Sequence, residues 1–236
     1  MIEPLVLLPD MGADASIWRA VVEPLSAVHP IMFLPVTQAE RAEEIASELV
    51  MMLPQRFALL GHGLGSVVAL ELVRRAGNRV NRLALVSAYP LSEAPEIAAQ
   101  RESRIIAAAT GRLGDAVHDE IGTWGLARDE SKVHNRQVLH RVAEALGPDV
   151  FRRQSRLMQR RRDHTATLAT IKQPTLVICG AQDQITPPRR HDWLAEMIPG
   201  AEIRVFEDAG HVPVLETPDL LLSAIRDWMA RPLLLR

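Results

Sequence analysis

Cysteine is almost missing from this chain of 236 residues, and long apolar runs are missing altogether. Because Cys179 is the only cysteine, no internal disulfide can form, which fits a reducing compartment. It ends an apolar run, so we interpret it as a buried strand residue and not as a nucleophile. No run reaches the ~20 apolar residues of a membrane helix, and the N-terminus lacks the basic segment and cleavage site of a signal peptide. We expect a cytoplasmic protein with no membrane partner.

Excess positive charge and metal-binding patterns are also lacking. A net charge of -2 argues against a dedicated nucleic-acid-binding protein. No cluster of histidine, cysteine and carboxylate residues has the spacing of metal ligands, and no glycine-rich phosphate loop is present. We therefore expect no metal and no cofactor, and a small molecule as the partner. The sequence leaves open whether the protein is a monomer or a homodimer.

The chain does contain a regular alternation of strand-like and helical patterns. Short apolar runs rich in β-formers occur at residues 5–8, 31–34, 57–60, 83–86, 175–178 and 202–206. Helical patterns separate most of them, at residues 16–28, 39–53, 64–76, 188–198 and 218–229. This alternation predicts an α/β protein with a parallel sheet and helices on both faces. Ligands of such open sheets bind where the carboxyl ends of the strands meet.

Residues 91–168 break the alternation, because their periodicity is helical and they hold no convincing strand. We predict that this segment is a helical insertion in a core formed by residues 1–90 and 169–236. Two helix starts elsewhere carry cap signals. Ser16 is the predicted cap of the first helix, and Thr217, which precedes a proline, is that of the last.

A basic run lies within the helical insertion. Arg152, Arg156 and Arg160 share one helix face through their i,i+4 spacing. We expect a solvated surface there, and a rim that attracts acidic substrates is the alternative.

A short motif stands where the third strand meets its following helix. Residues 61–65 read Gly-His-Gly-Leu-Gly, after the apolar strand 57–60 and at the start of the amphipathic helix 64–76. A strand, a G-x-S-x-G turn and a helix make up the nucleophile elbow, and this stretch resembles the α/β-hydrolase family at every position but one. The departure is Gly63, which has no side chain where that family carries its nucleophilic serine.

Two further segments resemble the same family, in its chain order of nucleophile, acid and histidine. Asp183 lies in the segment G-A-Q-D-Q-I-T-P after one strand, and His211 lies in D-A-G-H-V-P after the next. The resemblance implies that His211 transfers the nucleophile's proton and that Asp183 orients its ring. The blander interpretations are an Asx-turn for Asp183 and a capping or surface position for His211. Glu93 is a weaker candidate for the acid, and Glu207 and Asp208 are expected to point elsewhere.

The segment Leu-Pro-Asp-Met-Gly at residues 8–12 occupies the place of the family's His-Gly loop after the first strand. The resemblance implies that the backbone amides of Met11 and Leu64 form the oxyanion hole, where each donor is worth roughly 3–4 kcal/mol. Pro9 and Asp10 depart from the usual His-Gly pair.

Four further residues receive smaller roles. Trp18 and Trp124 are candidate aromatic residues of the substrate pocket, although large apolar side chains more often belong to the core. Ser66 lies on the helix after the elbow and is expected to face the interior, so it does not replace the missing nucleophile. His62 is expected to pack or hydrogen-bond beneath the turn.

The resemblance to α/β-hydrolases covers essentially the whole chain. It implies a mostly parallel six-stranded sheet with helices on both faces, and a helical cap at residues 91–168 inserted before the last two strands. It also implies hydrolysis of a carboxylic ester, or of a related acyl bond such as a lactone or amide, in a small-molecule acyl substrate.

Gly63 implies a variant of that chemistry. Glycine accepts the strained elbow freely but carries no nucleophile, so we predict a folded protein whose acyl transfer is inactivated or severely impaired. One alternative is a native glycine with a water, activated by His211, in the space of the missing side chain. Others are a lyase or oxygenase that uses His211 as its base, and a ligand-binding protein on a hydrolase scaffold.

Overall fold

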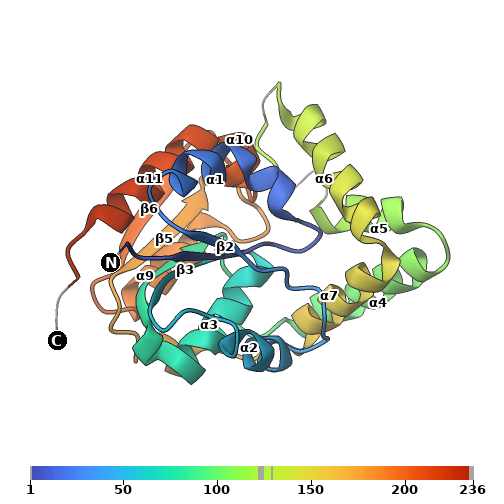
Figure 1. Ribbon diagram of the computed structural model, residues 1–236. Coiled ribbons are helices and arrows are strands. Elements are labelled where there is room, and N and C mark those ends of the chain that lie inside the picture. The colour runs from blue at the N-terminus through green and yellow to red at the C-terminus, as the bar shows by residue number, and fades with distance from the viewer. Residues whose placement is uncertain (1, 122–124, 129, 234–236) are drawn as a thin grey trace.

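Six parallel strands form a single sheet at the centre of the protein (Figure 1). The computed structural model describes residues 2–121, 125–128 and 130–233. The strands are β1 (Leu5–Leu8), β2 (Ile31–Phe33), β3 (Phe57–His62), β4 (Val80–Val86), β5 (Thr175–Gly180) and β6 (Glu202–Phe206), in the spatial order β2-β1-β3-β4-β5-β6. Every neighbouring pair runs parallel. The α/β class and the six-stranded sheet expected from the sequence are confirmed.

Helices cover both faces of this sheet (Figure 1). One face carries the 3-10 turn η1 (Ala15–Trp18), α1 (Arg19–Ser26), α10 (Pro213–Glu216) and α11 (Pro218–Ala230). The other carries α2 (Ala42–Val50), α3 (Leu64–Ala76), which leads into the 3-10 turn η2 (Gly77–Arg79), and α9 (Pro188–Met197). Successive side chains of a strand point to opposite faces, so Leu7 packs into one apolar core and Leu8 into the other.

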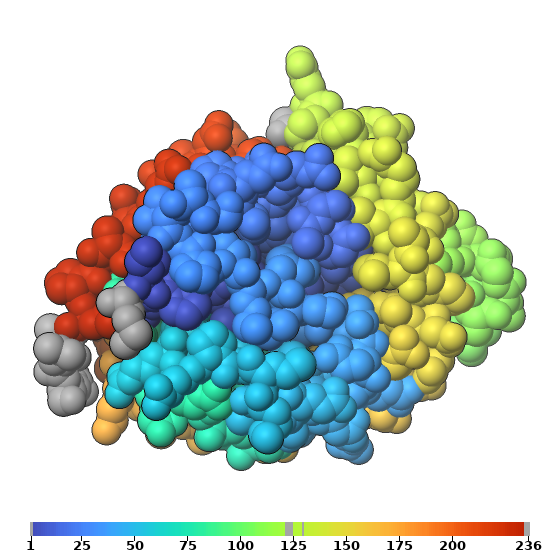
Figure 2. Space-filling model, viewed as in Figure 1, coloured from blue at the N-terminus to red at the C-terminus, as the bar shows by residue number. Residues whose placement is uncertain are grey.

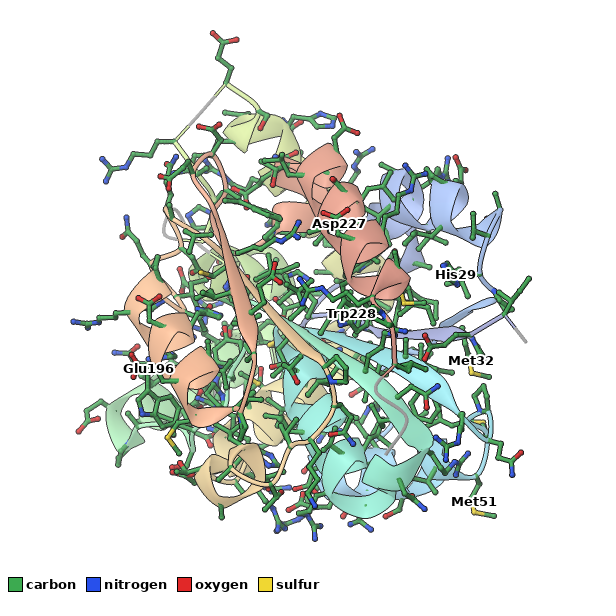
Figure 3. All side chains as sticks on the ribbon, turned by 90° about the vertical axis from the view of Figure 1, so that its left-hand side faces the viewer. His29, Met32, Met51, Glu196, Asp227 and Trp228 are labelled. Carbon is green, nitrogen blue, oxygen red and sulfur yellow. The ribbon has the colours of Figure 1, made fainter. Side chains whose placement is uncertain are left out.

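The helices bury one side only, as their amphipathic sequences require. Trp228 of α11 lies against the strands and is fully buried, whereas the side chain of its neighbour Asp227 is 56% exposed (Figure 3). Met51, at the end of α2, points away from the protein. Among the described residues, no helix is both long and apolar enough to cross a membrane.

In the part of residues 91–168 that the structure describes, five helices follow one another. They are α4 (Pro95–Ala109), α5 (Leu113–Ile121), α6 (Lys132–Leu146), α7 (Pro148–Arg160) and α8 (Thr165–Leu168). Helices α4 to α7 lie together beyond one end of the sheet, and their green and yellow surfaces form one side of the protein (Figures 1 and 2). The amide of Gly12, just beyond β1, donates a hydrogen bond of 3.0 Å to Gln154 of α7. The helical segment therefore lies over the carboxyl ends of the strands.

The predicted cap at Ser16 is wrong. Asp14 is the cap of η1, and its carboxylate accepts a hydrogen bond of 2.8 Å from the amide of Ser16. Both residue types cap helices well, so the sequence alone did not rank the two positions. Thr217 does occupy the cap position of α11, but its side chain makes no capping hydrogen bond there.

The arginine face of α7 is bound to the rest of the protein by ion pairs. Arg152 and Arg160 both pair with Glu40, which lies between β2 and α2, and Arg156 pairs with Glu102 of α4. The face therefore packs the helical segment against its neighbours, although its side chains remain partly exposed.

Candidate active site

Four loops meet at the carboxyl edge of the sheet. Because β1 and β3 are adjacent and in parallel register, Asp10 just after β1 lies beside Gly63 just after β3. The loops after β5 and β6 carry Asp183 and His211 to the same place. The edge that open α/β sheets use for ligands thus collects the residues that the sequence singled out.

Gly63 adopts the strained backbone of an elbow. Its φ is 50° and its ψ is -118°, a region that non-glycine residues rarely enter. The turn is also tightly packed, because a Cβ added to Gly65 would lie 2.2 Å from the carbonyl oxygen of Leu8. The two glycines let the start of α3 approach the end of β1 closely.

The space of the missing side chain is filled by Asp10. A Cβ added to Gly63 would lie 1.9 Å from Oδ1 and 2.0 Å from Cγ of Asp10. The carboxylate of Asp10 therefore stands where the family's serine would begin. This finding removes the space that the water-mediated alternative assigned to a water molecule.

The same carboxylate occupies the predicted oxyanion hole. Oδ1 of Asp10 accepts hydrogen bonds of 2.7 Å from the amides of both Met11 and Leu64. Oδ2 lies 3.2 Å from Nε2 of His211. Asp10 thus bonds to the two amides and to the histidine at once, with its two oxygens in different surroundings.

His211 is held by Asp183 from the other side. Nδ1 of His211 lies 2.8 Å from Oδ2 of Asp183, and Nε2 lies 3.3 Å from the hydroxyl of Tyr89. Asp183 also accepts hydrogen bonds of 2.8 and 2.9 Å from the amides of Ile185 and Thr186. The Asx-turn and the contact with histidine, which the sequence posed as alternatives, therefore occur together.

The charges of these groups support one another. Burial favours neutral His211, but the charge of Asp183, with contributions from Tyr89 and Asp10, raises its pKa well above the usual value. Burial would raise the pKa of Asp10, yet its hydrogen bond to His211 and the imidazolium charge lower it to about 2. The pKa of Asp183 is also lowered, because the charge of His211 outweighs burial. The three shifts together favour an imidazolium between two carboxylates.

Three of the four residues given smaller roles, Ser66, His62 and Trp18, lie beneath this site. The hydroxyl of buried Ser66 donates to the carbonyl of Gly63 at 2.6 Å, and Nε2 of buried His62 lies 2.9 Å from the carbonyl oxygen of His211. Trp18 is fully buried in the core with its ring edge-to-face on His62 at 5.8 Å, so its assignment to the pocket is wrong. Trp124 lies outside the described residues.

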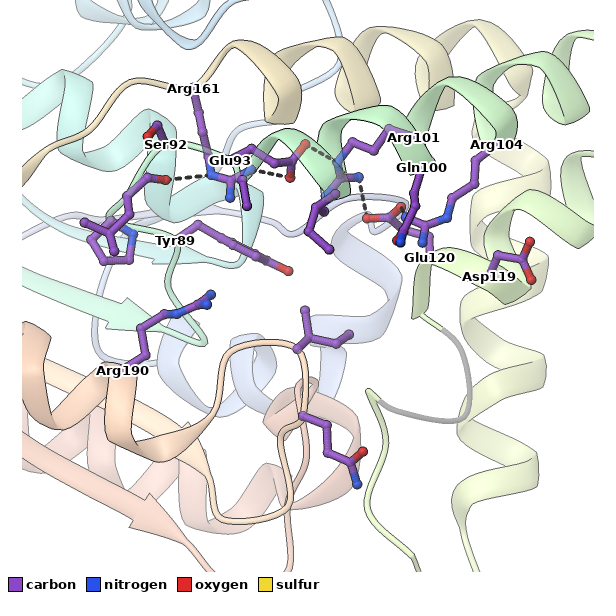
Figure 4. A pocket seen from close by; sticks show the side chains of 16 residues that line it. Tyr89, Ser92, Glu93, Gln100, Arg101, Arg104, Asp119, Glu120, Arg161 and Arg190 are labelled. Carbon is purple, nitrogen blue, oxygen red and sulfur yellow. Dashed lines mark hydrogen bonds and ion pairs between the residues drawn. The ribbon is translucent and has the colours of Figure 1, made fainter.

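A cavity of about 520 Å³ opens next to the site (Figure 4). Its lining includes Tyr89, whose hydroxyl contacts His211, and residues of α4 and α5. One wall is an ion-paired arginine network formed by Glu93, Arg101, Arg104, Glu120 and Arg161. Glu93 is part of that network, so it is not the acid that partners His211.

Tyr89 and the contacts of Asp10 were missed by the sequence reasoning. The signal that could have found the contact of Asp10 was a pair of departures from the family pattern. A carboxylate stands in the loop after β1 and a glycine stands at the nucleophile position, and the parallel pairing of β1 with β3 places these two loops side by side.

Among the described residues, no group of three or more histidine, cysteine and acidic side chains could hold a metal ion. Cys179 is fully buried in β5, and burial raises the pKa of its thiol to about 12, so it is not a poised nucleophile.

Known proteins resemble the chain over nearly its full length. It is 30% identical over 241 residues to the pimeloyl-[acyl-carrier protein] methyl ester esterase of Aromatoleum aromaticum, covering 94% of this chain and 96% of that protein. It is 27% identical to the enzyme of the same name from Nitrosomonas europaea, covering 93% and 92%.

Solved structures agree with the fold. The thermophilic esterase from Thermogutta terrifontis superposes with a TM-score of 0.86 at 23% identity, covering 96% of this chain and 89% of that one. The enol-lactonase from Burkholderia xenovorans superposes with a TM-score of 0.85 at 20% identity, covering 98% and 93%. A model of the alpha/beta hydrolase family matches residues 5–224. The chain belongs to the alpha/beta hydrolase family.

Proposed function

We propose that this protein has the machinery of a hydrolase for a carboxylic ester, or for a related acyl bond such as a lactone or amide, of a small-molecule acyl substrate. His211 is its proton-transfer group, Asp183 orients His211, and the amides of Met11 and Leu64 form its oxyanion hole. The observation that carries the proposal is the 2.8 Å contact between His211 and Asp183 beside two converging amides at the elbow. The relatives named as methyl ester esterases support this bond class.

In the chain as it stands, acyl transfer by this route is inactivated or severely impaired for two reasons. Gly63 supplies no nucleophile, and loss of the serine in a comparable triad costs about 10⁶ in turnover. In addition, Asp10 occupies both oxyanion-hole amides, so the carbonyl oxygen of an acyl substrate has no donors to approach. Each such donor contributes about 3 kcal/mol to the transition state.

The rival functions fit the site less well. The water-mediated, lyase and oxygenase alternatives need free space beside Nε2 of His211, and the carboxylate of Asp10 lies there at 3.2 Å and fills the space beside Gly63. A purely ligand-binding role gives no reason for the contact between His211 and Asp183, which holds the ring in the orientation that proton transfer needs.

The test restores both missing features at once. Gly63→Ser alone places a Cβ 1.9 Å from Asp10, so we expect little hydrolysis of a panel of short and medium-chain para-nitrophenyl esters. Asp10→Gly alone frees the amides but supplies no nucleophile. The double variant Asp10→Gly/Gly63→Ser is expected to exceed either single variant by about 10²-fold or more in kcat/KM.

The control adds His211→Ala to the double variant, which should remove the gain because the serine then has no base. Circular dichroism establishes that each variant is folded. A folded double variant that hydrolyses no ester faster than the single variants would overturn the proposal and leave ligand binding as the better account.

A further inference from the structure

The carboxylate of Glu216, in α10, is bonded to three backbone amides. Its Oε2 accepts hydrogen bonds of 3.1 Å from Gly210 and 2.9 Å from Val212. These two residues flank His211 in the loop after β6, which we call the histidine loop. Its Oε1 accepts a hydrogen bond of 2.6 Å from the amide of Ala127. Both oxygens of a carboxylate are acceptors, and hydrogen bonds to a charged acceptor are stronger than neutral ones. One side chain thus holds the backbone around the histidine and a residue of the helical segment.

The helical segment reaches the site through residues 125–128, which lie between α5 and α6 and which we call the docked segment. Its first carbonyl oxygen, of Gly125, accepts a hydrogen bond of 2.5 Å from the amide of His211. Its last amide, of Arg128, donates one of 2.9 Å to the side chain of Gln182, in the loop that carries the acid. The docked segment therefore binds the loops of both the histidine and the acid.

The docked segment can lie close against the histidine loop because that loop has a glycine at the contact. A Cβ added to Gly210 would lie 2.4 Å from the carbonyl oxygen of Gly125 and 2.8 Å from the amide nitrogen of Ala127. Leu126 is 2% exposed and belongs to the same apolar core as Val212. The contact is therefore a packed interface as well as a set of hydrogen bonds.

We propose that Glu216 is a positioning residue for His211, and that it acts by holding the docked segment on the histidine loop. The amides of residues 210, 211 and 212 are all bonded, the outer two to Glu216 and the middle one to the docked segment. These bonds fix the backbone from which the ring projects, and Asp183, 2.8 Å from Nδ1, fixes how the ring is turned. The proposal rests on the proposed function, in which His211 transfers the proton.

This arrangement gives the helical segment a part in placing the proton-transfer group. Such placement matters because a shift of about 1 Å in a reacting group can cost about 10²-fold in rate. Contacts of α7 with the core reach other loops, since Gln154 binds the loop after β1 and two arginines pair with Glu40. Loosening the docked segment should therefore disturb His211, whereas loosening α7 from Glu40 should not.

The first experiment asks whether the docked segment and the histidine loop loosen together. Glu216→Asp keeps the charge but is one methylene shorter, so it should not reach Ala127 and the amides beside His211 at once. Hydrogen exchange followed by mass spectrometry should then be about tenfold faster in the peptides that contain residues 125–128 and 210–212. Glu40→Gln is the matched control and should leave both peptides unchanged, because it breaks a different contact between the helical segment and the core. Unchanged exchange in a folded Glu216→Asp protein would overturn the proposal.

The second experiment observes the ring of His211 by NMR in protein labelled with nitrogen-15 at histidine. The Nδ1 signal, assigned by its absence from His211→Gln, reports the hydrogen bond to Asp183. In Glu216→Asp it should move toward the value of a solvent-exposed histidine, and in Glu40→Gln it should stay in place. Because Glu216→Asp retains the carboxylate, such a change reports position and not charge. Faster exchange with an unmoved Nδ1 signal would mean that Glu216 only stabilises the fold. If Glu216→Asp does not fold, Glu216→Gln, which keeps the length and one acceptor oxygen, replaces it in both measurements.

The third experiment measures catalysis in the Asp10→Gly/Gly63→Ser protein. Adding Glu216→Asp should lower kcat about tenfold or more and change KM by no more than about twofold, because the contact places the histidine and does not bind the ester. Adding Glu40→Gln should change neither constant. An unaltered kcat would contradict the positioning role. If the double variant hydrolyses no ester, the proposed function fails, while hydrogen exchange and the Nδ1 signal still decide whether Glu216 positions His211.

Discussion

Two clusters of buried opposite charges lie near each other in this protein, and their cations differ. In the arginine network, Glu93 contacts Arg101 at 2.8 Å and Arg161 at 2.5 Å, while Glu120 contacts Arg101 at 2.5 Å. In the candidate active site, the cation between two carboxylates is His211. Arginine keeps its proton at any physiological pH, whereas histidine gives its proton up. The first cluster can therefore only hold structure, and the second can also transfer a proton.

The clusters differ in what they join as well. The network links α4, α5 and the chain just after α7, so it holds parts of the helical segment to one another. The site links loops that follow four different strands. The arginine network, whose charge is fixed, thus lies beside the candidate active site, whose charge can change. Each can be altered by substitution without altering the other.

The largest loss of unfolding free energy is expected when the arginine network is broken. Arg101→Met leaves Glu93 and Glu120 with fewer partners, and removing one member of a buried ion pair typically costs about 3–5 kcal/mol. Arg204→Met is the matched control, because Arg204 pairs with Glu202 and Asp227 at side-chain exposures of 30% or more, where about 1 kcal/mol or less is at stake. Urea unfolding at neutral pH measures both. Equal losses in the two variants would show that the network is not a structural anchor.

A smaller effect is expected from adding a side chain at the elbow. Gly63→Ala puts a Cβ into a left-handed backbone, at a cost of about 1–3 kcal/mol, and into the carboxylate of Asp10. Asp10→Gly removes the clash between the new Cβ and the carboxylate, but it leaves the backbone strain at position 63. Unfolding free energies of the single and double variants should therefore be non-additive, with a coupling of about 0.5–3 kcal/mol. Additive losses would mean that Asp10 moves aside freely.

The sequence predicted the sheet and its main helices well, because period-two and period-3.6 patterns are local. Helix α3 begins and ends where its pattern predicted, at Leu64–Ala76. Asp183 and His211 were found because each follows a strand in a recognisable segment. The contact of Asp10 with Gly63 was not found, since it depends on which strands are neighbours and on one side-chain rotamer. The bond between Glu93 and Arg161 joins two loops far apart in the chain, so no local pattern reports it.

The smallest expected effect is on the pH dependence of stability. It comes from two buried histidines whose pKa values are shifted in opposite directions. Nε2 of His191 accepts a hydrogen bond of 2.9 Å from the amide of Ala88, which requires a neutral ring. Burial, only partly offset by the charge of Asp183, lowers its pKa to about 4. His211 is the reverse case, because its pKa is raised. The stability it contributes is fully present below the unfolded value of about 6.5 and is lost as the pH rises through its folded pKa.

For His191 the sign is opposite. Between about pH 6.5 and 4 the unfolded chain binds a proton that the folded protein does not, so stability falls as the pH is lowered, by about 1.4 kcal/mol per pH unit at most. In urea unfolding at pH 6.5 and 5.5, the unaltered protein should therefore lose about 1 kcal/mol more than His191→Gln, which has no ring to protonate. Equal losses would place the acid sensitivity of the fold elsewhere. A larger loss in the unaltered protein would mean that the ring of His191, held by the amide of Ala88, stays neutral in the folded protein.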